Sequence, residues 1–156
     1  MNDADFMRQA IASAREGIER GQTPFGACIV RDGEVLSRRH NEVWALTDIT
    51  AHAEILAIRE ACRKLGRIDL SGSVLYSTCE PCPMCFSACH WARIEKIRYG
   101  AGIADAQAAG FNEITFSNQD MKTYGGSPVE VESGLLKEEC VALFRFWLEK
   151  NLSRPY

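Results

Sequence analysis

Segments with helical spacing of apolar residues alternate along this chain with short strand-like apolar runs. The helical spacing predicts helices at about residues 3–20, 51–65, 83–93 and 134–152, with Thr50 as the N-cap of the second. The apolar runs predict strands at residues 25–30, 35–40, 74–77 and 97–100, and an edge strand at 129–131. Residues 101–127 give no clear pattern, because Gly110, Gly125 and Gly126 interrupt any long element there.

This order of elements predicts the architecture. The first two strands flank Asp32-Gly33, a dipeptide typical of tight hairpin turns, so we expect them to pair antiparallel. Parallel strands need helical crossovers, which cover both faces of a sheet. We therefore expect an α/β fold, a three-layer α/β/α sandwich around a five-stranded mixed sheet. No repeat or linker divides the 156 residues, so residues 1–156 are expected to form a single domain.

Charge and hydropathy argue against several classes of function. The chain has 18 Lys and Arg against 21 Asp and Glu, a net charge of −3, and no basic cluster typical of nucleic-acid-binding surfaces. A tRNA partner is therefore disfavoured. No apolar run approaches the length that crosses a bilayer, and the N-terminus lacks the features of a secretory signal. We expect no membrane contact and a cytoplasmic location.

Two short motifs carry most of the chemistry. They are His52-Ala53-Glu54 and Pro81-Cys82-Pro83-Met84-Cys85, each at the start of a predicted helix. One imidazole and two thiolates are three ligands for Zn²⁺ and leave the fourth tetrahedral position open, as catalytic zinc sites do. We predict one Zn²⁺ per subunit, bound by His52, Cys82 and Cys85, with water or hydroxide as the fourth ligand.

Glu54 is the predicted catalytic residue. Zinc lowers the pKa of bound water from about 15.7 to about 7, which supplies hydroxide at neutral pH. Glu54 lies two residues beyond His52, where its carboxyl group can move the water's proton to a ring nitrogen and a leaving amine. Backbone amides near Ala53 and Cys82 would hold the developing charge. A redox Cys-x-x-Cys pair, the alternative, would leave His52 and Glu54 without a role.

The two motifs together are the signature of zinc deaminases. The sequence resembles the cytidine and deoxycytidylate deaminase superfamily, and within it the bacterial guanine deaminases. The resemblance extends to Pro24-Phe25-Gly26-Ala27, Asn41, Trp91-Ala92-Arg93 and Ala109-Gly110-Phe111-Asn112-Glu113. It implies a cytidine deaminase-like fold, a homodimer, and hydrolytic removal of an exocyclic amino group from a small purine or related base.

The resemblance also implies residues that bind the substrate. Phe25 would lie against the purine ring, Asn41 would hydrogen-bond its polar edge, and Glu113 would bind its amino group. The C-terminal aromatic residue, Tyr156, would cover the bound base. We further expect Trp91, which follows the second motif at helical spacing, to form a wall of the pocket.

The predicted reaction is hydrolysis of guanine to xanthine and ammonia, with guanosine, isoguanine and aminotriazines as related substrates. The main alternative is conversion of adenosine to inosine in tRNA, because Val129–Leu136 and Glu138-Glu139-Cys140 resemble the C-terminal part of tRNA adenosine deaminases. An alternative of another class is a non-catalytic zinc-binding module. That alternative predicts that Glu54→Gln leaves every function intact.

Overall fold

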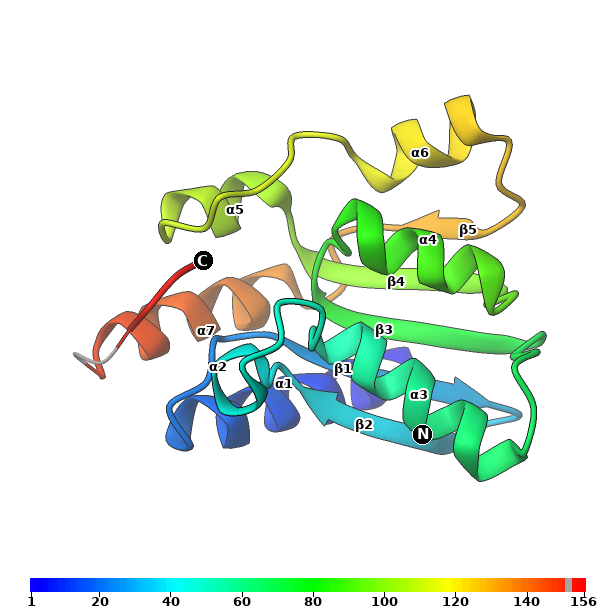
Figure 1. Ribbon diagram of the computed structural model, residues 1–156, viewed down its shortest axis with the longest axis horizontal. Helices are drawn as coiled ribbons and strands as arrows, with labels where there is room; N and C mark the ends of the chain where they lie inside the picture. The colour runs from blue at the N-terminus through cyan, green and yellow to red at the C-terminus, as the bar shows by residue number, and fades with distance from the viewer. Residues whose placement is uncertain (151–152) are drawn as a thin grey trace.

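The computed structural model describes residues 1–150 and 153–156, and within them five strands form one mixed sheet (Figure 1). The strands are β1 (Gly26–Arg31), β2 (Glu34–His40), β3 (Ser73–Cys79), β4 (Lys96–Ala101) and β5 (Glu130–Glu132). The helices are α1 (Asp3–Glu19), α2 (Val43–Leu46), α3 (Ala53–Leu65), α4 (Pro83–Trp91), α5 (Ile103–Ala108), α6 (Asn118–Gly125) and α7 (Lys137–Leu148).

The strand order is β2-β1-β3-β4-β5. β1 pairs antiparallel with both β2 and β3, whereas the β3–β4 and β4–β5 pairs are parallel. The antiparallel pairing of the first two strands is confirmed. Asp32 and Gly33 in their turn both have positive φ, 51° and 77°, which matches the right-handed twist of a two-residue hairpin.

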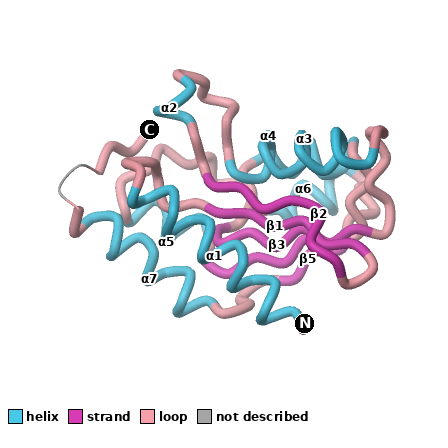
Figure 2. The backbone as a smooth tube through the Cα atoms, turned by 90° about the horizontal axis from the view of Figure 1, so that it is seen from below, coloured by secondary structure: helices cyan, strands magenta, loops and turns pink. Residues whose placement is uncertain are grey.

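Helices cover both faces of the sheet. α1, α5 and α7 lie on one side, and α3, α4 and α6 lie on the other (Figure 2). Strand residues alternate between the two layers: Tyr76 packs with the α1 and α7 side chains, and its neighbour Leu75 with those of α3 and α4. The predicted three-layer α/β/α sandwich around a five-stranded mixed sheet is confirmed.

Several element boundaries differ from the sequence prediction. α3 begins at Ala53 with His52 as its N-cap, because the amide and hydroxyl of Thr50 bond instead to Asp48. The last helix ends at Leu148, short of the predicted residue 152; residues 151–152 lie outside the described part of the chain. α2, α5 and α6 were not predicted, because helices of four to eight residues carry little periodicity.

The topology brings two helix N-termini to one edge of the sheet. β3 runs parallel to β4, and the chain leaves the carboxyl end of β3 at Cys79 to enter α4 at Pro83. The start of α3 lies at the same edge (Figure 1). Open α/β sheets bind ligands outside the carboxyl ends of their parallel strands.

None of the helices in the described residues is long and apolar enough to cross a membrane.

Candidate active site

His52, Cys82 and Cys85 form a compact group at this edge. His52 Nδ1 lies 3.6 Å from the Sγ atom of each cysteine, and the three ligand atoms lie within 4.8 Å of one another. Zn–S bonds of about 2.3 Å and Zn–N bonds of about 2.0 Å at a tetrahedral angle separate sulfur from nitrogen by roughly 3.5 Å, close to the distances seen here. The side chains are therefore placed to bind one tetrahedral zinc ion.

Helix starts explain why these side chains converge. His52 is the N-cap of α3 and Cys82 is the N-cap of α4, both in extended backbone conformations, and Cys85 follows within the first turn of α4. Pro83 is accommodated at the first helical position, where its missing N–H has no intrahelical acceptor. The positive ends of two helix dipoles thus point at the group and favour its thiolate forms.

The pKa values of the two cysteines are shifted in opposite directions. Hydrogen bonding from Cys85 lowers the pKa of Cys82 to about 4 against the effect of burial, and His52 lowers it further. Burial, with the neighbouring Cys82, raises the pKa of Cys85 well above its usual value. Burial lowers the pKa of His52, but Cys82 and Glu54 raise it overall. A divalent cation would supply the charge that stabilises the second thiolate.

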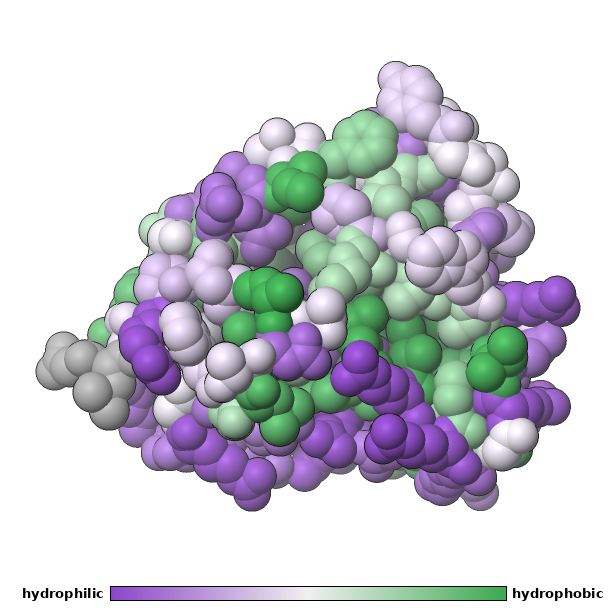
Figure 3. All heavy atoms as spheres, viewed as in Figure 1, coloured by the Kyte–Doolittle hydropathy of each residue, from purple (hydrophilic) through white to green (hydrophobic). Residues whose placement is uncertain are grey.

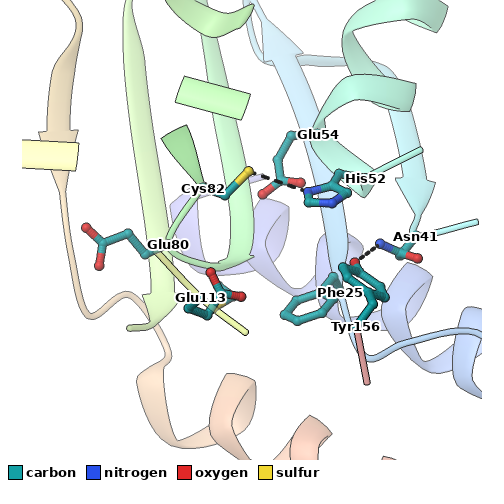
Figure 4. Close-up of a pocket in the computed structure, with 9 residues that line it drawn as sticks. Phe25, Asn41, His52, Glu54, Glu80, Cys82, Glu113 and Tyr156 are labelled. Atoms are coloured by element: carbon teal, nitrogen blue, oxygen red, sulfur yellow. Dashed lines mark hydrogen bonds between the residues drawn. The ribbon is translucent and has the colours of Figure 1, made fainter. Parts of the chain in front are cut away.

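Glu54 lies buried beside the group, in the first turn of α3 (Figure 4). The Ser77 hydroxyl donates a hydrogen bond to Glu54 Oε1 at 3.1 Å, and Cys85 Sγ lies 3.5 Å from Oε2. Burial raises the pKa of Glu54. A carboxyl group whose pKa is raised toward neutrality can both accept and return a proton, which is the requirement for general acid–base catalysis.

Two adjoining cavities open next to Glu54. The inner cavity has about 20 Å³ of free volume, room for one water molecule. It is lined by Phe25, Asn41, His52, Glu54, Cys79, Glu80, Cys82, Glu113 and Tyr156. The outer cavity, of about 320 Å³, is lined by Ile49, His52, Cys82, Pro83, Met84, Asn112, Glu113, Ile114 and Tyr156. Four residues line both, so the two form one site of the size that holds a small ligand.

Asn41 and Tyr156 are bonded to each other within this site. Asn41 is fully buried, and its Nδ2 atom donates to the Tyr156 hydroxyl at 2.6 Å (Figure 4). The Tyr156 carbonyl accepts from the Asn112 amide at 3.0 Å, and the indole N–H of Trp44 donates to the Arg154 carbonyl at 2.9 Å. Tyr156 therefore lies in the site of its own chain, and Arg154 is held beside Trp44.

Phe25 and Glu113 also line the inner cavity, Phe25 beside Tyr156 and Glu113 across from it (Figure 4). The Phe25 ring packs edge-on against Phe111, with ring centroids 4.8 Å apart. Glu113 follows Phe111 by two residues and is half-buried, and burial together with Cys82 raises its pKa. The structure thus brings both residues to the pocket with Asn41 and Tyr156.

Trp91 does not join the pocket. It is the last residue of α4, whereas Cys82 and Cys85 lie at the start of that helix, roughly 10 Å away at 1.5 Å per residue. Its side chain is 76% exposed and lines a separate depression. The expected pocket wall is therefore not formed by Trp91 of the same chain. Ala53 is buried as the first residue of α3, and only its backbone amide can serve the site.

Cys79 and Glu80 also line the inner cavity, although neither has a predicted role in the site. Cys79 is buried at the end of β3. Glu80 follows it directly. The only sequence signal was their position immediately before Pro81-Cys82, which does not reveal which way either side chain points.

The fold brings a His/Cys/Cys group and a buried glutamate together at the N-termini of α3 and α4. This combination defines the class of zinc-dependent hydrolytic deaminases. Comparison with known families agrees. Residues 1–101 match the family described as the cytidine and deoxycytidylate deaminase zinc-binding region, so the chain belongs to this deaminase family.

Relatives within the family have different substrates in their names. A guanine deaminase of Bacillus subtilis (strain 168) is 46% identical over 114 residues, 72% of this chain and 73% of its own. A tRNA-specific adenosine deaminase of Agrobacterium fabrum is 42% identical over 148 residues, 94% of this chain and 95% of its own. The solved structure of a guanine deaminase from Nitrosomonas europaea superposes with a TM-score of 0.85 at 28% identity, covering 94% of this chain and 84% of that one.

Proposed function

We propose that the protein hydrolyses guanine to xanthine and ammonia with one bound zinc ion. The observation that carries this proposal is the charge of the site. The carboxylates of Glu54 and Glu113 face the inner cavity, while that of Glu80 accepts from the Asn118 backbone amide, and no Lys or Arg of the described residues lines either cavity. Carboxylates accept hydrogen bonds from the N–H groups of an aminopurine, whereas a nucleic-acid backbone requires cations.

Zinc, when bound, lowers the pKa of a coordinated water molecule and so supplies the nucleophile. Glu54 takes the two protons of the attacking water in turn and delivers one to the ring nitrogen and the other to the departing amino group. The net reaction consumes guanine and water and releases xanthine and ammonia. The Ser77 hydroxyl holds the Glu54 carboxyl group toward the site, and the amides at Ala53 and Cys82, at two helix starts, stabilise the negative charge that develops.

The substrate would be held by the remaining cavity residues. In this proposal Phe25 lies against the flat ring, Glu113 accepts from the amino group, and Asn41 bonds the polar edge. The Asn41 amide donates a hydrogen bond to the Tyr156 hydroxyl in the structure. An entering base would replace Tyr156 as the partner of Asn41. Tyr156, at the boundary of the two cavities, would then cover the base.

A second candidate, deamination of adenosine in tRNA, is favoured by one observation. The Agrobacterium fabrum tRNA-specific enzyme matches 94% of this chain, whereas the Bacillus subtilis guanine deaminase matches 72%. A larger share of the chain therefore resembles the tRNA-specific enzyme. The charge of the cavities argues the other way.

Ammonia release from a substrate panel separates the candidates. We expect the zinc-loaded protein to turn over guanine, with adenine, cytosine and an adenosine-bearing tRNA anticodon stem-loop as comparisons. Glu113→Ala should lower kcat/KM for guanine by roughly 10-fold or more, because it removes the acceptor proposed for the amino group, and a lost hydrogen-bonding group in the site is a strong discriminator. Activity on the stem-loop alone, with a gel shift weakened by salt, would replace guanine by tRNA as the substrate.

We propose that the protein forms a homodimer. Apolar and weakly polar residues gather over α4 and the adjoining part of α3 in the middle of one face, and hydrophilic residues follow its lower edge (Figure 3). α4 contains no acidic residue and ends in the exposed Trp91. A helix that is apolar around its circumference favours burial on both sides. Light scattering should give a mass about twice 17.4 kDa, and a monomer mass would contradict the proposal.

A further inference from the structure

The loop that carries Cys82 is tied to the start of α6. The Asn118 side-chain Nδ2 atom donates to the Pro81 carbonyl at 2.6 Å, and the Asn118 backbone N–H donates to Glu80 Oε1 at 2.9 Å. Asn118 is fully buried. Two hydrogen bonds thus join the same short segments, which lie far apart in the sequence.

We propose that Asn118 and Glu80 are positioning residues that hold the Cys82 sulfur where zinc requires it. The Pro81 carbonyl belongs to the peptide plane that leads into Cys82, so fixing that carbonyl restricts the direction of the Cys82 side chain. This inference rests on the zinc site of the proposed function, but it does not depend on the substrate. Neither residue belongs to the His/Cys/Cys group, so each acts through the backbone.

The sequence of the loop explains why it needs such support. Pro81 and Pro83 flank Cys82 and have no backbone N–H, so the loop can make few hydrogen bonds of its own. The Glu80 amide bonds to the Ala101 carbonyl at 2.8 Å, which anchors the entry to the loop. Between that point and α4, the Pro81 carbonyl is held by the Asn118 side chain.

The stability of α6 alone does not explain an asparagine at position 118. Its Oδ1 atom is buried and has no hydrogen-bond partner among residues 1–150 and 153–156, which is unfavourable for a polar atom. An apolar side chain of similar shape would avoid that cost. The start of α6 is already capped by Ser117, whose hydroxyl accepts from the Asp120 amide at 3.0 Å. The contribution specific to the Asn118 side chain is therefore its bond to Pro81.

Asn118→Leu tests the proposal, with Ser117→Ala as the matched control. Both changes affect the start of α6, but only the first removes a bond to the zinc loop. We expect Asn118→Leu to weaken zinc affinity about 10-fold in competition with a chelator. We also expect it to alter the visible absorption of the cobalt-substituted protein. Ser117→Ala should lower the melting temperature and leave both readouts unchanged. Unchanged zinc affinity and cobalt absorption in Asn118→Leu would overturn the proposal.

Glu80 provides a second test if Asn118→Leu does not fold. Glu80→Gln keeps an oxygen that can accept from the Asn118 amide, whereas Glu80→Ala removes it. We expect weakened zinc affinity in Glu80→Ala and near-normal affinity in Glu80→Gln. Equal zinc affinity in the two variants would contradict the role of Glu80. Because chelator competition needs no substrate, a failure of guanine as substrate would leave these results unaffected.

Discussion

Glu54→Gln is expected to abolish deamination while the protein keeps its zinc. General acid–base groups contribute about 10²–10⁴-fold to rate, and Glu54 is proposed to carry each proton transfer, so we expect a loss at the upper end of that range. The substitution is nearly isosteric, and glutamine can still accept the hydrogen bond from Ser77. The measurements are kcat on the best substrate of the panel and the zinc content by atomic absorption.

A control on the same helix separates this effect from a general change in α3. Glu60 is half-exposed and pairs with Arg39 away from the site, so Glu60→Gln should leave the rate unchanged. A non-catalytic zinc module predicts that Glu54→Gln behaves like this control. Full turnover by the zinc-loaded Glu54→Gln protein would therefore reject the proposed mechanism.

Removal of zinc is expected to have the second largest effect. Activity should fall to background after treatment with a chelator and return with one equivalent of Zn²⁺. Free zinc at 1,000 times its Kd stabilises a folded protein by about 4 kcal/mol. For a domain of this size that corresponds to roughly 10 °C in melting temperature. Affinity should fall as the pH is lowered, because the cysteine ligands must be deprotonated to bind.

The ligand set can be tested with matched cysteine variants. Cys82→Ser should lose zinc and the associated rise in melting temperature, because a hydroxyl is a much poorer zinc ligand than a thiolate. Cys62 lies in the second half of α3, away from the His/Cys/Cys group. The Cys62→Ser variant should therefore retain both the zinc and the rise in melting temperature. A chelated protein that keeps its full rate, or a Cys82→Ser protein that binds zinc normally, would contradict the assigned ligands.

The fold was largely predictable because long elements carry their own periodicity. The apolar stripe of α1 and the Asp32-Gly33 turn are local patterns, and both are present as expected. The errors lie where a side chain changed partner or where an element was short. Thr50 bonds to Asp48 and does not cap α3, and the brief helices α5 and α6 were not recognised in a region interrupted by glycines.

The candidate site was predictable only in part. His52, Glu54, Cys82 and Cys85 could be identified because ligand type and short-range spacing are written in adjacent residues, and each motif lies at its own helix start. Trp91 was misplaced because proximity in sequence to a motif does not give distance along a helix. Asn118 carried no signal, since its partner Pro81 lies in a distant segment.

By itself, the sequence determined the alternation of helices and strands, the candidate zinc ligands and the acid next to them, because these depend on local backbone geometry and on side-chain chemistry. The family resemblance named Phe25, Asn41, Glu113 and Tyr156, but only the tertiary structure brings them around one cavity and joins Glu80 and Asn118 to the loop of Cys82. Those contacts join distant segments, and their geometry arises from packing the helices on the sheet, which no local pattern encodes.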